Sequence, residues 1–104
     1  MSAVGMVEVY GLVAAFCACD AGCKAADVTV EPFDKNKPAN PNGLPVPLQI
    51  LVKFRGSVDN VTAAVEAAKA AAEKVSGVVQ SHIISNVEPN GAEKMLHLNA
   101  FDKN

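Results

Sequence analysis

The segment VGMVEVYGLVAAFCACDAGCKAADV, residues 4–28, decides the fold. Its first half alternates as a strand does, and Gly11 ends that alternation. Apolar residues then recur at steps of three and four, which predicts a helix whose buried side holds Leu12, Phe16, Cys19, Cys23 and Ala26. The other side of this helix is mixed and carries Val13, Cys17, Asp20 and Lys24. A strand, a turn and a helix therefore open the chain, and the mixed side faces either water or a neighbouring subunit.

The size of the chain favours association between subunits. Its 104 residues suffice for one domain, but a domain this small buries only a modest fraction of its surface when it folds alone. Half of the residues are hydrophobic, while aromatic residues make up only 5%. Alanine and valine dominate instead, and such small side chains suit the close packing of helices within or between subunits.

Charge and hydropathy argue against several classes of function. The net charge is −2 and the nine Lys and Arg residues are scattered, whereas nucleic-acid binding requires a concentrated cationic surface. No apolar run approaches the roughly 20 residues of a membrane-spanning helix, and the first residues lack the charged start of a secretory signal. A cytoplasmic location is therefore expected, in which the three cysteines stay reduced.

Two strands flank a long loop in the middle of the chain. Residues 28–33 indicate a short strand that Pro32 weakens, because proline has no amide hydrogen for the ladder. Residues 36–47 hold four prolines and an Asn42-Gly43 turn, a composition that forbids helix and predicts an inserted loop. Residues 48–55 then alternate, with Leu48, Ile50, Val52 and Phe54 on the buried side and Gln49, Lys53 and Arg55 on the other.

The second half of the chain begins with the most regular helix. Ser57 is placed to cap it, Asp59 lies in its first turn, and its apolar stripe consists of Val58, Val61, Val65, Ala68, Ala72 and Val75. Residues 78–87 follow as a fourth strand, and residues 92–98 as a short helix before a polar tail at about residues 97–104. The order βαββαβ predicts an α+β fold, a four-stranded antiparallel sheet with helices on one face and the other face or the edges free for partners.

The reactive side chains do not predict a catalytic, cofactor-binding or metal site. At 100° per residue, Cys19 and Cys23 share one side of the first helix while Cys17 points nearly away, so one helix does not aim all three at one ion. Buried or interface thiols are therefore expected. His82 lies in a strand without a second ligand nearby and is expected to be structural, and His97 to be solvated. The absence of a phosphate loop, a CxxC pair and an HExxH motif speaks against an enzyme.

Several short motifs nevertheless resemble one protein family. The motifs are Gly5-Met6-Val7-Glu8, Gly11-Leu12-Val13-Ala14-Ala15, Asp20, Lys24-Ala25-Ala26, Arg55-Gly56, His82-Ile83-Ile84 and Glu93-Lys94-Met95-Leu96. Together they resemble the single-domain shell proteins of bacterial microcompartments, which carry one BMC domain and tile polyhedral protein organelles. The resemblance covers most of the chain except about residues 36–47, and it implies a single shell domain over residues 1–104.

The resemblance implies a structural function in a microcompartment shell. It implies a homohexameric facet tile that joins other shell proteins around encapsulated enzymes and passes or blocks small metabolites at a central pore. Lys24, with Asp20 beside it, would hold neighbouring hexamers together at the edge. The inserted loop takes the place of the family's pore loop, so the pore-lining residues would be Lys35, Asn36, Lys37, Asn40, Asn42 and Gly43. Rings of Lys35 and Lys37, offset by Asp34, would favour anionic metabolites.

Two departures from the family leave alternatives open. An arginine-containing motif of the family is replaced by Ser85-Asn86-Val87-Glu88, which predicts weaker tiling or different partners. Some family members bind an iron–sulfur cluster through pore-loop cysteines, but this loop has none, and an electron-transfer variant of the tile is the less favoured alternative. The second alternative function is a trimeric nitrogen-signalling regulator, a class of protein that has the same order of elements and also carries a long loop.

Overall fold

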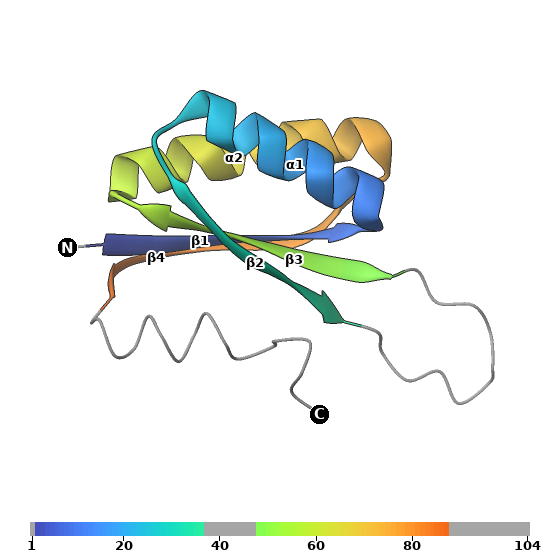
Figure 1. Cartoon of the computed structure of the whole chain (residues 1–104), viewed down its shortest axis with the longest axis horizontal. Helices are drawn as coiled ribbons and strands as arrows, with labels where there is room; N and C mark the ends of the chain where they lie inside the picture. The colour runs from blue at the N-terminus through green and yellow to red at the C-terminus, as the bar shows by residue number, and fades with distance from the viewer. Residues whose placement is uncertain (1, 37–47, 88–104) are drawn as a thin grey trace.

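The structure, a computed structural model, describes residues 2–36 and 48–87, without the side chains of Pro32, Lys35, Asn36, Asn86 and Val87. Its elements are β1 (Ser2–Tyr10), α1 (Leu12–Ala25), β2 (Thr29–Asn36), β3 (Gln49–Gly56), α2 (Val58–Val75) and β4 (Val78–Val87). The four strands form one antiparallel sheet in the order β2-β3-β1-β4, and both helices cover the same face of it (Figure 1). The predicted α+β fold with the order βαββαβ is confirmed. The predicted helix at residues 92–98 lies outside the described residues.

The core lies between the sheet and the two helices. β1 contributes Ala3, Val7 and Val9, and β3 contributes Ile50, Val52 and Phe54, all of them fully buried. The sheet is close to α2 at Gly5, where a Cβ atom would lie 2.5 Å from Cγ1 of Val61 and 2.6 Å from Cγ2 of Val65. Small residues therefore set the distance between the layers.

The predicted buried side of α1 is wrong for Leu12, Phe16 and Cys23, which are exposed, whereas Cys19 and Ala26 are half-buried and pack against the core. The helix buries Ala14, Ala15, Ala18 and Gly22, whereas Leu12 and Phe16 are 48% and 60% exposed. The physical reason is the short distance to the rest of the core, because a Cβ atom on Gly22 would lie 2.4 Å from Cζ of Phe54 and 3.2 Å from the carbonyl oxygen of Ala64. Only a small side chain fits there, so the large apolar side chains of α1 are turned outward.

The predicted stripe of α2 is confirmed in its centre. Val61, Val65, Ala68 and Ala72 are buried, while Val58 and Val75 at the two ends are 40% and 45% exposed. The hydroxyl of Ser57 accepts a hydrogen bond from the amide of Asn60 at 3.2 Å, so it caps the helix as predicted.

β2 is longer than the sequence predicts. Its pairing with β3 is irregular between Glu31 and Asp34, around Pro32, and then resumes as far as the pair of Asn36 with Gln49. Proline is tolerated here because β2 is an edge strand, where an amide hydrogen is not needed on the open side. The irregularity shifts the register without ending the strand.

Candidate functional site

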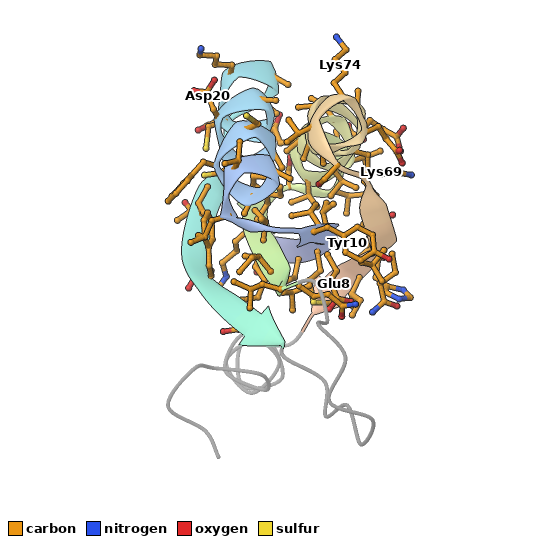
Figure 2. All side chains as sticks on the ribbon, turned by 90° about the vertical axis from the view of Figure 1, so that its right-hand side faces the viewer. Glu8, Tyr10, Asp20, Lys69 and Lys74 are labelled. Atoms are coloured by element: carbon orange, nitrogen blue, oxygen red, sulfur yellow. The ribbon has the colours of Figure 1, made fainter. Side chains whose placement is uncertain are left out.

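One end of α1 carries the two residues that the resemblance assigns to the hexamer edge. Nζ of Lys24 lies 3.0 Å from Oδ2 of Asp20, one helical turn away, and the two side chains are 75% and 63% exposed. Figure 2 shows Asp20 on the part of α1 that is farthest from the sheet. An ion pair this exposed contributes little to stability, so both groups are available to a neighbouring molecule.

The base of the inserted loop lies at the opposite end of the domain. β2 ends and β3 begins there with the pair Asn36 and Gln49, and the amide of Gly11 donates a hydrogen bond to the carbonyl of Leu48 at 2.7 Å. Gly11 can hold this position because its φ of 86° is readily adopted by glycine. From this point α1 runs back along the sheet for 14 residues, about 21 Å, toward the end that holds Lys24 (Figure 1).

The structure describes only the start of the predicted pore segment. The backbone of Lys35 and Asn36 belongs to the last part of β2, opposite Ile50 and Gln49 of β3. The other predicted pore residues, Lys37, Asn40, Asn42 and Gly43, lie outside the described residues. The pore lining therefore stays a prediction, whereas the place where the segment leaves the sheet is defined.

A buried ion pair lies just before that place. Nζ of Lys53 on β3 is 2.6 Å from Oδ2 of Asp34 on β2, and their side chains are only 2% and 4% exposed. Lys53 lies on the face of the sheet opposite the helices, as predicted. Its side chain is buried there, whereas the sequence predicts that only the helix-facing side of this strand is buried. Asp34 also does not act as a free charge beside the loop lysines, because its carboxylate is paired with Lys53.

A second polar group occupies the same face of the sheet. Glu8 of β1 is 5% exposed, and its Oε1 accepts a hydrogen bond of 2.7 Å from Nε2 of Gln80 on β4. Figure 2 shows Glu8 on the side of the sheet away from the helices. His82 is exposed, with Nε2 3.4 Å from Oε1 of Gln80. The ring nitrogen of His82 thus has a side-chain neighbour but lies at the surface.

The cysteines are distributed over α1 as their spacing predicts, although only in part as buried groups. Cys17 and Cys19 are half-buried and Cys23 is exposed. Burial, together with the neighbouring Cys23 thiol and the Asp20 carboxylate, raises the pKa of the Cys19 thiol. Within residues 2–36 and 48–87, no group of three or more His, Cys, Asp or Glu residues is placed to hold a metal ion.

Large apolar side chains are exposed on two opposite edges of the domain. The first edge combines the exposed Leu12, Val13 and Phe16 of α1 with the half-buried Phe33 of β2, whose ring centre lies 5.7 Å from that of Phe16. The second edge lies at β4 and α2, at the opposite end of the strand order, and carries Val58, Val79 and Ile83. We call them the α1–β2 edge and the β4–α2 edge. Exposed apolar patches of this kind mark sites of protein association.

Two features of the surface are not predicted from the sequence. Leu12 and Phe16 of the α1–β2 edge are predicted to be buried, and Val13 to lie on the mixed side of the helix, although the small residues at positions 14, 18 and 22 share one side of a helix and indicate a close contact there. The pairing of Asp34 with Lys53 joins residues 19 positions apart, and no local pattern reveals it. Among the described helices, none is long and apolar enough to cross a membrane.

Comparison with known proteins agrees with this architecture. Residues 3–87 match the family model described as BMC domain. The chain is 34% identical over 102 residues to the carboxysome shell protein CcmK3 of Halothece sp. (strain PCC 7418), and the match covers 97% of this chain and 91% of that protein.

A solved structure provides a second comparison. The crystal structure of a microcompartments protein from Desulfitobacterium hafniense DCB superposes with a TM-score of 0.69 at 29% identity. The match covers 86% of this chain but only 43% of the longer one, so our chain spans less than half of that protein. From the family match over residues 3–87, supported by both relatives, the chain belongs to the BMC-domain family of bacterial microcompartment shell proteins.

Proposed function

We propose that the chain is a structural tile of a microcompartment shell, in which six copies close into a ring around a central pore. The match to a carboxysome shell protein along nearly the whole chain supports a place in such a shell. The proposed tile joins its own copies and other shell proteins, encloses enzymes and has no catalytic function of its own. The family match does not favour the trimeric nitrogen-signalling regulator.

The main support for the proposed ring is the presence of apolar edges on opposite sides of the domain. The strand order places β2 and β4 on the two outer edges of the sheet, and exposed apolar side chains accompany each of them. Contact of the α1–β2 edge of one copy with the β4–α2 edge of the next is heterologous, because the two surfaces differ. Such contacts produce a closed ring when the rotation between copies closes.

The position of the loop supports a pore at the centre of that ring. The base of the loop and the Lys24 end of α1 are separated by the length of the helix, so one can face the axis while the other faces a neighbouring ring. Because the carboxylate of Asp34 is paired with Lys53, it offsets the positive charge of the proposed Lys35 and Lys37 rings less than the sequence suggests. Anionic metabolites are the expected permeants.

Native mass spectrometry of the purified full chain tests the proposed assembly. The expected species is a hexamer that persists on dilution into the low micromolar range. A trimer stabilised by nucleotides would instead support the sensor, and a monomer at every concentration would contradict both proposals.

A charge on either apolar edge should dissociate the ring. We expect Phe16→Asp and Ile83→Asp each to convert hexamers to monomers or short open assemblies, because a carboxylate that becomes buried in an interface without a partner is strongly unfavourable. Ala70→Asp, at an exposed position of α2 outside both edges, is the matched control and should remain hexameric. Size-exclusion chromatography with light scattering measures the mass, and far-UV circular dichroism checks folding. Unchanged hexamers for both edge variants would contradict the proposed interface.

Removal of the Lys24 ammonium should affect the contacts between rings and leave the ring itself intact. We expect Lys24→Ala to form hexamers whose thermal stability is nearly unchanged, since the Lys24–Asp20 pair is exposed. Extended sheets seen by electron microscopy should become smaller or disappear. Lys69→Ala, which removes another partly exposed paired lysine, is the control. Sheets of normal extent from Lys24→Ala would show that this lysine does not join hexamers.

A further inference from the structure

Cys19 and Cys23 form a pair of thiols on one side of α1. They are one helical turn apart, which places their Cβ atoms about 5–6 Å from each other. Cys19 is half-buried and packs against the core cluster, while Cys23 is exposed. The pair therefore combines an anchored ligand with an accessible one. Cys17 lies on a different side of the helix, about 200° from Cys19.

The same spacing opposes a disulfide within the pair. A disulfide requires Cβ atoms about 3.5–4.5 Å apart, which is shorter than one turn of an intact helix provides. The surroundings hold this helix in place, because Ala18 and Gly22, the neighbours of these cysteines in the chain, are fully packed into the core. Oxidation to a disulfide would need local unwinding of α1, so the thiols remain a dithiol.

The number of ligands selects the kind of ion that the pair can hold. Soft thiolates prefer Cu(I), Zn(II) and iron–sulfur clusters. Zinc and iron–sulfur clusters require about four ligands, and in the described part of the chain no third His, Cys, Asp or Glu joins the two cysteines. Of these three, Cu(I) is the one that two thiolates alone can bind.

We propose that Cys19 and Cys23 form a two-coordinate dithiolate site for a soft monovalent metal ion, Cu(I), on α1. Binding replaces the two S–H bonds by two S–Cu bonds and releases two protons to solvent, while the oxidation states of copper and sulfur stay the same. This site departs from the absence of a metal site expected from the sequence. Both ligands come from one turn of one chain, on the same side of α1 as Leu12 and Phe16, so in the proposed ring the site lies at the contact between subunits.

Competition with a chromophoric Cu(I) chelator such as bicinchoninate tests the site in the full chain under anaerobic conditions. We expect one Cu(I) per chain for the unchanged protein. Cys19→Ser and Cys23→Ser should each lower the affinity by about 100-fold or more, because each variant retains only one thiolate and loses the effect of two linked ligands. Cys17→Ser, in the same helix, is the matched control and should bind like the unchanged protein.

Two results would overturn the proposal. The first is equal retention of copper by all three variants, and the second is a loss in Cys17→Ser as large as in the other two. Phenylarsine oxide provides an independent readout, since it reacts with two thiols, forms two As–S bonds and loses its oxygen as water together with the two thiol protons. Mass spectrometry should find one such adduct with two bonded cysteines in the unchanged protein and in Cys17→Ser, and none in the Cys19→Ser and Cys23→Ser variants. An adduct of the same type in either of those two would also contradict the site.

Discussion

Replacement of Lys53 by methionine is expected to lower the free energy of unfolding by about 3–5 kcal/mol, the range found when one partner of a buried ion pair is removed. Nζ of Lys53 lies 2.6 Å from Oδ2 of Asp34, and both side chains are almost completely buried. Methionine retains most of the length of the lysine side chain but leaves the carboxylate of Asp34 buried without its cation. Urea denaturation at one fixed protein concentration measures the change, because assembly makes the apparent stability depend on concentration.

A double variant and a variant of a second lysine test whether the loss of stability comes from the broken ion pair. Asp34→Asn combined with Lys53→Met should recover a large part of the loss, since neither charge then remains buried. Lys69→Met is the matched control, because Lys69 lies 3.7 Å from Glu66 in a pair whose side chains are 38% and 68% exposed, and this variant should lose at most about 0.5 kcal/mol. Equal losses in the single and double variants would mean that the packing of the lysine chain, and not its charge, stabilises this part of the sheet.

Replacement of Gly22 by valine is expected to be the most damaging change that adds atoms to α1. A Cβ atom at this position would lie 2.4 Å and 2.6 Å from two atoms of the Phe54 ring, and 3.2 Å from the backbone oxygen of Ala64. Overpacking of a core costs about 1–3 kcal/mol and sometimes more. The better helix propensity of valine offsets only a few tenths of a kcal/mol. Thermal and urea denaturation should both show the loss.

A smaller residue at position 54 should reduce that loss. Phe54→Leu alone leaves unfilled space, but in combination with Gly22→Val the two changes should compensate in part, so that the double variant is more stable than the sum of the single effects predicts. Ala25→Val, at the exposed last position of the same helix, is the control and should change stability little. Additive losses at positions 22 and 54 would contradict direct contact between α1 and the Phe54 ring.

The sequence predicts the type and order of the described elements and the bounds of β4, but not which side of α1 is buried. The strand at residues 78–87 has the predicted limits. For α1, the recurrence of apolar residues at steps of three and four favours Leu12 and Phe16 as buried residues, whereas the short distance to Phe54 admits only a small residue such as Gly22. Apolar periodicity measures hydrophobicity along one helix, and it contains no information on how close the next layer lies.

In the candidate site, only contacts between residues that are close in the sequence are predictable. Lys24 and Asp20 pair over a single helical turn, so their spacing already predicts the contact. The pair of Asp34 and Lys53 depends on the register between β2 and β3, which shifts around Pro32 by an amount that alternation does not reveal. The pore residues from Lys37 to Gly43 stay a prediction.

The hairpin formed by β2 and β3 also has an evolutionary consequence. Because both strands are fixed where they leave the sheet, the connection between them can gain or lose residues without moving either helix. The entropic cost of closing a loop, expressed as free energy, rises by only about 0.6 kcal/mol for each doubling of the loop length. In the proposed ring, insertion and deletion in this connection would change the diameter and chemistry of the pore, while the perimeter of the subunit, and with it the fit to neighbouring tiles, would stay the same.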